Sequence, residues 1–146
     1  MRVLVLAAAS FITFKWLLVP IRTEGSSMLP TYAPDKLNFV NRLAYAAGKP
    51  VRGDVVAIRM AGPHVLYVKR VIGLPGERVA VRGGTVFIND KLLDEPYVKH
   101  RRAWDVDEVV LGSSEYFLMG DNRGMSAADH DFGRADLDRI LGKVVF

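Results

Sequence analysis

The sequence contains no cysteine among its 146 residues. This absence excludes disulfide bonds, cysteine nucleophiles and thiolate metal sites. Histidine is scarce as well, and the three that are present, His64, His100 and His130, lack the spacing of metal ligands. Each histidine is therefore expected at the surface. We predict no metal site and no cofactor.

A strong excess of one charge is also missing. The net charge of +4 comes from 20 Lys and Arg against 16 Asp and Glu, and the basic residues are scattered along the chain. Such a mild excess is weak evidence for nucleic-acid binding, and contact with anionic lipid headgroups explains it as well. The sequence has no Gly-rich phosphate-binding loop either. Nucleic acid is therefore not an expected partner.

Apolar residues are plentiful, and they are concentrated at the N-terminus. Half of the sequence is hydrophobic, with a mean hydropathy of +0.14. Val3 to Ile21 form 19 nearly continuous apolar positions, interrupted by Lys15. A helix that crosses a bilayer needs roughly 20 such residues. The pattern predicts one transmembrane helix in a membrane anchor, residues 1–22, followed by one compact domain, residues 23–146.

Two other interpretations of this segment remain open. Arg2, the apolar run and the small residues Ala7 to Ser10 also resemble a cleavable secretory signal, although no A-x-A-like site follows the run. A buried core helix is the third possibility. Lys15 weakens the anchor interpretation, because a lysine in the middle of a span costs about 2.5 to 3.5 kcal/mol, but its long stem can reach the interface.

Beyond Lys36 the sequence has an all-β pattern of short apolar runs separated by turn residues. Gly83-Gly84 and Asn89-Asp90 are suited to tight hairpin turns, and Arg134 to Ile140 is the one helical candidate. We predict a twisted, partly closed antiparallel β-sheet. The expected strands are Lys36 to Asn41, Asp54 to Met60, Val65 to Ile72, Arg78 to Arg82, Thr85 to Ile88, Val109 to Leu111, Glu115 to Met119 and Leu141 to Phe146.

Three short segments offer chemistry. Ser27 lies just after the apolar segment, and taken alone its surroundings describe a turn. Lys69 lies in the strand VLYVKRVI, where alternation places Lys69 and Arg70 on opposite faces that are both apolar. An amine has an ordinary pKa near 10.4, and burial can lower the pKa of a lysine enough to make it a general base. A surface cation is the simpler interpretation of this strand.

The third segment is Gly120-Asp121-Asn122-Arg123, followed by Ser126. It combines a turn glycine, two side chains that bond to their own backbone and a guanidinium. Without further context it describes a turn with an internal ion pair between Asp121 and Arg123.

Taken together, the segments resemble the type I signal peptidase family over almost the whole chain. The matching blocks occur in the family's order and are S-M-x-P-T at Ser27 to Thr31, R-G-D-V-V at Arg52 to Val56, Y-V-K-R-V-I-G-L-P-G-E at Tyr67 to Glu77, V-F-I-N-D at Val86 to Asp90, L-D-E-P-Y at Leu93 to Tyr97 and G-D-N-R-x-x-S at Gly120 to Ser126.

The resemblance implies a serine endopeptidase in which Ser27 is the nucleophile and Lys69 the general base. It further implies that Ser126 orients the lysine amine and that Asp121 and Arg123 form a buried bracing pair. The backbone N–H of Ser27 would donate to the oxyanion. The second donor in the family is often a serine where this chain has Gly25, so that donor stays open.

The substrates implied are preproteins cut after small residues of the Ala-X-Ala type, with Met28, Leu29, Tyr67 and Val68 lining shallow apolar pockets. The partners implied are therefore signal peptides and the lipid bilayer. The location implied is the cytoplasmic (inner) membrane, with the catalytic domain on its outer face. Only Arg2 and Arg22 flank the apolar segment, so the charge bias itself barely sets the orientation.

The chain departs from the family pattern after Ser126. Ala128 and His130 occupy positions where the family usually has Asp and Arg, so Asp129 or Asp131 would have to pair with Arg123 or Arg134 instead. Two alternatives follow. The chain could be a specialised pilin-maturing or inner-membrane peptidase of the same clan, or a catalytically inactive module that binds preproteins.

Overall fold

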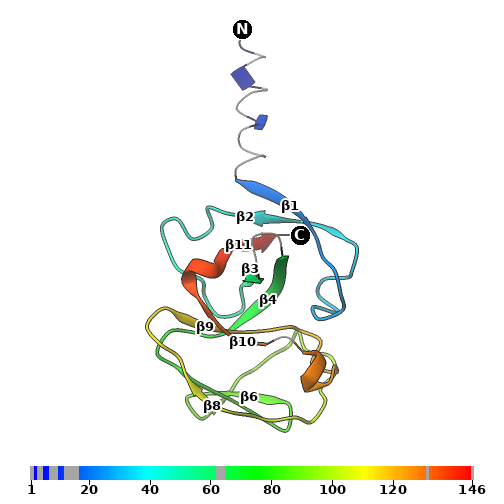
Figure 1. Ribbon diagram of the computed structural model, residues 1–146, viewed down its shortest axis with the longest axis vertical. Helices are drawn as coiled ribbons and strands as arrows, with labels where there is room; N and C mark the ends of the chain where they lie inside the picture. Colours follow the sequence, from blue (N-terminus) through cyan, green and yellow to red (C-terminus); the bar gives the residue numbers. More distant parts are fainter. Residues whose placement is uncertain are drawn as a thin grey trace.

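The computed structural model describes residues 17–61, 65–130 and 132–145, together with residues 2, 5, 6, 10 and 11, which have helical backbone; the side chains of residues 60, 61 and 65 are not described. The described residues form eleven β-strands and two short 3-10 helices (Figure 1). Every strand pairing is antiparallel. The all-β prediction is confirmed.

The strands form two open sheets, so the predicted partial closure is wrong. The larger sheet has the order β1-β2-β11-β3-β4-β9-β10 and the smaller one β7-β6-β5-β8, and each sheet begins and ends on a different strand. Figure 1 shows β1 and β2 at one end of the molecule and β6 and β8 at the other. The strands are β1 (Leu18–Arg22), β2 (Leu37–Asn41), β3 (Val55–Ala61), β4 (Val65–Gly73), β5 (Arg78–Arg82), β6 (Thr85–Ile88), β7 (Lys91–Leu92), β8 (Val106–Val110), β9 (Glu115–Met119), β10 (Gly133–Asp136) and β11 (Ile140–Val145).

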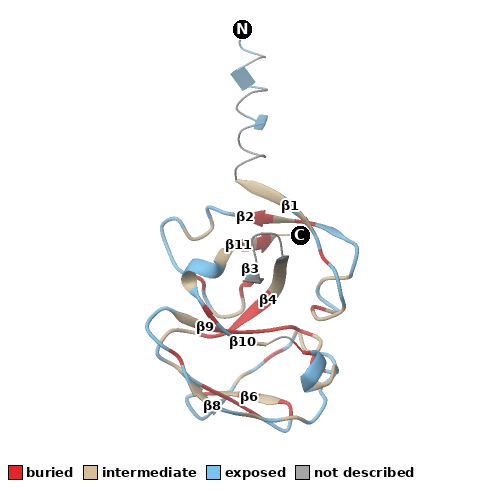
Figure 2. Ribbon diagram, in the orientation of Figure 1, coloured by how far each residue is buried: buried red, intermediate tan, exposed pale blue. Residues whose placement is uncertain are grey.

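The central strands of the larger sheet are apolar on both faces. In β3, Val56 and Ile58 join one hydrophobic cluster while Val55 and Ala57 join another. This division follows from the two-residue period of a strand, which sends neighbouring side chains to opposite faces. Figure 2 shows the resulting burial along the central part of the sheet.

A third cluster packs the two sheets together. It contains Phe117 and Met119 of β9 with Val79 and Val81 of β5, all almost completely buried. The two sheets therefore share one continuous apolar boundary. Since β4 lies beside β9 in the larger sheet, this boundary also supports the strand that carries Lys69.

The predicted hairpin turns are confirmed. Gly83 and Gly84 connect β5 to β6, and Asn89 and Asp90 connect β6 to β7. All four have positive φ angles, between 50° and 79°. Glycine, asparagine and aspartate are the residues that tolerate this left-handed region, which explains why the turns could be recognised in the sequence.

Two sequence predictions about secondary structure are wrong. The apolar run to Ile21 was expected to be helical throughout, but Leu18–Arg22 forms β1 and pairs with β2 in register. The helix expected at Arg134 to Ile140 is instead the end of β10, a 3-10 turn at Leu137–Arg139 and the start of β11.

Most of the predicted anchor, residues 1–22, lies outside the described residues. Among the residues that are described, no helix is both long enough and apolar enough to cross a membrane.

One polar network ties the β2–β3 connection to the last strand. Lys143 Nζ lies 2.6 Å from Asp54 Oδ1, and Oδ2 accepts hydrogen bonds from the Tyr45 hydroxyl and the Val51 N–H at 2.9 and 3.2 Å. Burial alone would raise the pKa of the Asp54 carboxyl, but these hydrogen bonds outweigh it and lower the pKa below the ordinary value of 3.8. The charged carboxylate therefore stabilises the fold.

This network predicts a pH-dependent stability. Because the pKa of Asp54 is lower in the folded chain, its contribution is present above about pH 4 and is lost as the pH falls through the folded value. We expect Asp54→Asn to lower the free energy of unfolding by about 1 to 3 kcal/mol at pH 7. Denaturant unfolding of both proteins should show that this difference shrinks toward pH 3. A difference that grew on acidification would contradict the prediction.

Candidate active site

Ser27 lies in the loop of residues 23–36 that connects β1 to β2. The backbone N–H of Asn122 donates to the Ser27 carbonyl at 2.9 Å, and Asn122 Nδ2 donates to the Ser26 carbonyl at 3.1 Å. Gly120 permits this close approach, because a Cβ there would lie 2.3 Å from the Ser27 carbonyl oxygen. The G-D-N-R segment thus contacts and supports the serine loop, residues 23–36.

Lys69 reaches Ser27 from the middle of β4. Its Nζ lies 3.1 Å from Ser27 Oγ, and the residue is only 3% exposed. The Tyr67 ring, two residues earlier on the strand, has its centroid 5.8 Å from the amine. The interpretation of Lys69 as a surface cation is therefore wrong. A buried amine in hydrogen-bond contact with a hydroxyl is an arrangement that can activate a serine.

Arg70 points to the other side of the strand and is held by a carboxylate. Its Nε and Nη2 donate to the two oxygens of Asp121 at 2.7 and 2.6 Å, and Thr31 donates to Oδ2 at 2.5 Å. Burial would lower the pKa of Arg70, but the hydrogen bond and charge of Asp121 raise it overall. Asp121 thereby connects the serine loop, through Thr31, to the strand that carries Lys69.

Arg123 is fully buried and pairs with Glu95. Its Nη2 and Nη1 lie 2.5 and 3.2 Å from the Glu95 oxygens, and its Nε donates to the Gly120 carbonyl at 2.8 Å. The expected pair between Asp121 and Arg123 is therefore wrong, although both side chains are buried as expected. Each binds a partner from elsewhere in the chain.

Tyr97 lies between these two ion pairs. Its hydroxyl donates to Glu95 Oε1 at 2.9 Å, and its ring stacks on the Arg70 guanidinium with 4.0 Å to the centroid. Burial, followed by the charge of Glu95, raises the pKa of the Tyr97 hydroxyl. The hydroxyl therefore stays protonated as a donor, and the two ion pairs form one buried network.

The segment after Ser126 does not form the pairings that the sequence predicted. The Ser126 hydroxyl donates to Asp129 Oδ2 at 2.5 Å across a 3-10 turn at Ala127–Asp129, in which Ala128 is exposed. That Ser126 orients the Lys69 amine stays a prediction. Arg134 Nη1 lies 3.7 Å from Glu115, and Asp131 is outside the described residues. Asp129 and Arg134 thus both have partners other than those expected.

His130 corrects the expectation that all histidines are exposed. It is 3% exposed, and its ring lies edge-on to Trp104 with 5.5 Å between centroids. A Cβ on Gly120 would lie 3.0 Å from His130 Cε1, so the ring packs against the turn that supports the serine loop. His100 is exposed as expected, while His64 lies outside the described residues.

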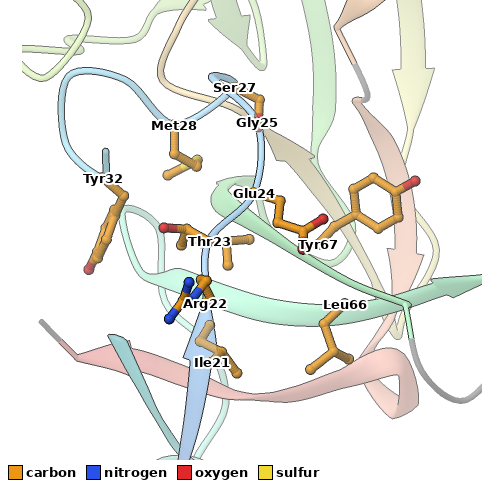
Figure 3. Close-up of a pocket in the computed structure, with 11 residues that line it drawn as sticks. Ile21, Arg22, Thr23, Glu24, Gly25, Ser27, Met28, Tyr32, Leu66 and Tyr67 are labelled. Atoms are coloured by element: carbon orange, nitrogen blue, oxygen red, sulfur yellow. The ribbon is translucent and has the colours of Figure 1, made fainter. Parts of the chain in front are cut away.

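A cavity of about 450 Å³ opens beside Ser27. Figure 3 shows Ser27 at one end and Ile21 and Leu66 at the other. Of the four residues expected to line the substrate pockets, Met28, Tyr67 and Val68 line this cavity and Leu29 does not; Gly25 lines it as well. Gly25 has a φ of +75°, and a Cβ there would meet no atom within 4 Å. The other lining residues are Ile21, Arg22, Thr23, Glu24, Tyr32 and Leu66.

The sequence interpretation missed two groups of site residues. The β1 side of the cavity was hidden because Ile21 and Arg22 had been assigned to the anchor. Glu95, Arg70 and Thr31 lie inside the matching sequence blocks, but nothing in their spacing identifies their partners. For Glu95 the sequence offers no signal beyond its place in the L-D-E-P-Y block.

Comparisons with known proteins agree with the resemblance noted in the motifs. The model of the family described as "Signal peptidase, peptidase S26" matches residues 1–146. Signal peptidase IB of Staphylococcus aureus is 34% identical, over 93% of this chain and 80% of that protein. A probable signal peptidase I-2 of Synechocystis sp. is 33% identical, over 82% of this chain and 57% of its own length.

A solved structure shows the same fold. The crystal structure of a signal peptidase I from Enterococcus faecalis V583 matches with a TM-score of 0.54 and 27% sequence identity, covering 66% of this chain and 97% of that one. The similar fold, the two relatives and the family match over the full length lead to one conclusion. The chain belongs to the signal peptidase family, peptidase S26.

Proposed function

We propose that the protein is a membrane-bound serine endopeptidase that removes N-terminal signal peptides from exported preproteins after small residues of the Ala-X-Ala type. The observation that carries the proposal is the 3.1 Å contact between Lys69 Nζ and Ser27 Oγ at a buried strand position. Membership of the signal peptidase family supports the substrate class. The cavity beside Ser27 supplies a place for the substrate.

Lys69 acts as the general base in this mechanism. Removal of an amine from water favours its uncharged form, and Lys69 is almost completely buried. The uncharged Nζ accepts the proton of the Ser27 hydroxyl while Oγ attacks the scissile carbonyl. The resulting ammonium then gives the proton to the leaving amine as the C–N bond breaks. Water hydrolyses the remaining ester, with Lys69 again as the base.

The oxyanion of the tetrahedral intermediate needs a hydrogen-bond donor. Within the described residues, the backbone N–H of Ser27 bonds to no other protein group and remains available for this role. Gly25 has no side chain to donate, so a second donor would have to come from backbone or water. One lost donor of this kind typically lowers the rate by about 10² to 10³-fold.

The substrate binds extended along the cavity, between β1 and β4. Met28 closes the cavity beside the nucleophile, and Tyr67 and Val68 form its β4 side. Small residues upstream of the cut would lie against these side chains. Leu29 is half-buried and does not line the cavity, so it has no direct contact with the substrate in this arrangement.

The proposed roles of Ser27 and Lys69 predict that preprotein cleavage depends completely on both side chains. We expect Ser27→Ala and Lys69→Arg each to lower kcat for preprotein cleavage by more than about 10³-fold. Arginine keeps the positive charge but cannot give up its proton at accessible pH, so Lys69→Arg tests the base and not merely the cation. Cleavage of an Ala-X-Ala preprotein in detergent micelles is the measurement.

Ser26→Ala and Lys99→Ala are matched controls and should cleave at nearly the rate of the unchanged protein. If Lys69→Arg retained substantial activity, the general-base role would be wrong. An unchanged protein that bound preproteins but cleaved none of a broad panel would identify it as a binding module. Cleavage of a single pilin-like substrate in that panel would identify a specialised peptidase.

The close contact between Gly120 and the Ser27 carbonyl predicts that a side chain at position 120 displaces Ser27. In Gly120→Ala the new Cβ overlaps the Ser27 carbonyl oxygen, so the serine loop must move. We expect kcat per folded enzyme to fall by about 10²-fold, because a displacement near 1 Å has that effect. Gly124→Ala is the control, since its Cβ would lie no closer than 3.4 Å to a neighbouring atom. Equal activities of the two variants would show that Gly120 does not position the serine loop.

We also propose that the apolar segment before β1 anchors the protein in the cytoplasmic membrane, with the catalytic domain on the outer face. The start of β1 at Leu18 shortens the apolar run expected for the anchor. It also places Lys15 near the end of that run, where a lysine can reach the headgroups. Signal peptides emerge on the outer side, which fixes the orientation of the domain.

The location can be tested in spheroplasts of a bacterial host. We expect the full chain to stay with the membrane pellet after alkaline carbonate extraction, because an inserted apolar helix is not held by charge. Externally added protease should degrade the domain without lysis, while a cytoplasmic marker protein stays intact. Recovery in the carbonate supernatant, or protection until lysis, would contradict the proposed anchor or its orientation.

A further inference from the structure

A second pocket lies on the same sheet, beyond the end of the Ser27 cavity. Its volume is about 190 Å³. Five neighbouring strands, β1, β2, β11, β3 and β4, and Arg42 just after β2 form its walls, which combine apolar side chains with two arginines. The lining residues are Val19, Val40, Leu66, Leu141, Arg42 and Arg59. It is separate from the catalytic groups, none of which lines it.

The floor of this pocket is an uncovered part of the hydrophobic core. Val19, Val40 and Leu141 belong to the same cluster as Met28. Met28 is buried, whereas Val19 and Leu141 are only partly buried. Leu66 lines both cavities and, in Figure 3, lies at the end away from Ser27. The pocket therefore lies beside β1, the strand that follows the apolar N-terminal sequence.

The rim of the pocket carries uncompensated positive charge. Arg42 and Arg59 are both exposed, and within the described residues neither guanidinium forms an ion pair. No carboxylate is among the lining residues. Arginine presents a planar fork of donors that matches the oxygens of a phosphate. The rim is thus complementary to an anion, and the floor to an apolar chain.

The size of the pocket limits its occupant. Sites for small molecules usually measure about 300 to 1,000 Å³, so about 190 Å³ holds a short apolar piece and leaves the rest of a larger molecule outside. An amphiphile with an anionic head and an apolar chain fits this description. The apolar part of a signal peptide would use the floor but would gain nothing from two cations.

We propose that this pocket binds one anionic phospholipid, with its phosphate at Arg42 and Arg59 and the start of an acyl chain on Val19, Leu66 and Leu141. The site would hold the open end of the sheet against the headgroup layer. The proposal shares the membrane location suggested above but is independent of the Ser27 and Lys69 chemistry, so it can fail while the peptidase assignment stands.

The test uses the full chain in non-ionic detergent. Native mass spectrometry would count bound dioctanoyl phosphatidylglycerol, with phosphatidylcholine of the same chain length as a second arm. We expect Arg42→Gln/Arg59→Gln to weaken phosphatidylglycerol binding at least about tenfold, because each cation near an anionic lipid contributes substantially. The control Arg102→Gln/Arg139→Gln removes two exposed arginines elsewhere and should change binding less than about twofold.

Two further variants keep the test decisive if Arg42→Gln/Arg59→Gln is unstable. Arg42→Lys/Arg59→Lys retains both charges and should retain most of the binding, whereas Leu141→Asn should weaken it by removing part of the floor. Thermal unfolding would establish that each variant is folded before lipid is added.

Four results would overturn the proposal. Equal losses in the test and control pairs would show a non-specific charge effect. Phosphatidylcholine binding as tightly as phosphatidylglycerol would remove the role of the arginines. Inorganic phosphate competing as strongly as the lipid would remove the role of the acyl chain. Displacement of the lipid by an apolar signal-sequence peptide, with no effect of the arginine substitutions on that peptide, would assign the pocket to the substrate.

Discussion

Two neighbouring residues of β4, both with basic side chains and both buried, constrain the rest of the site. Strand geometry sends Lys69 and Arg70 to opposite sides, so each must be accommodated in its own surroundings. Arg70 meets the carboxylate of Asp121 in a two-oxygen contact, whereas Lys69 meets the neutral hydroxyl of Ser27. Arg70 is thus paired with a carboxylate, whereas the Lys69 amine lies in hydrogen-bond contact with the Ser27 hydroxyl, the contact on which the proposed mechanism rests.

The buried ion pairs also hold the loops around the site. Asp121 ties Thr31 of the serine loop to β4, while Arg123 ties the Gly120 carbonyl to Glu95. Breaking a buried pair on one side leaves an unmatched charge in the interior, which destabilises a protein strongly. The positions of Ser27 and Lys69 therefore depend on ion pairs that do not touch a substrate. His130 adds an apolar and aromatic support behind the same turn.

The sequence predicted those features that depend on local rules. β5, β6 and β9 match their expected boundaries. For β5 and β6 the reason is local, since both runs end at residues with positive φ. β1 was missed because its apolar residues continue the run before it, and only pairing with β2 distinguishes strand from helix there. β10 was missed because Gly133–Asp136 is short and polar, as suits the edge of a sheet.

Among the site residues, the motif order identified Ser27 and Lys69, but their partners depend on contacts between distant segments. Nothing in the spacing of Arg123 distinguishes Asp121, two residues away, from Glu95, 28 residues away. The direct passage from Leu18 into the sheet has a mechanical meaning as well. All five residues of β1 pair with β2, which holds the strand in place at the edge of the sheet. The loop that carries Ser27 therefore starts from a fixed point at Arg22, on the edge of the larger sheet.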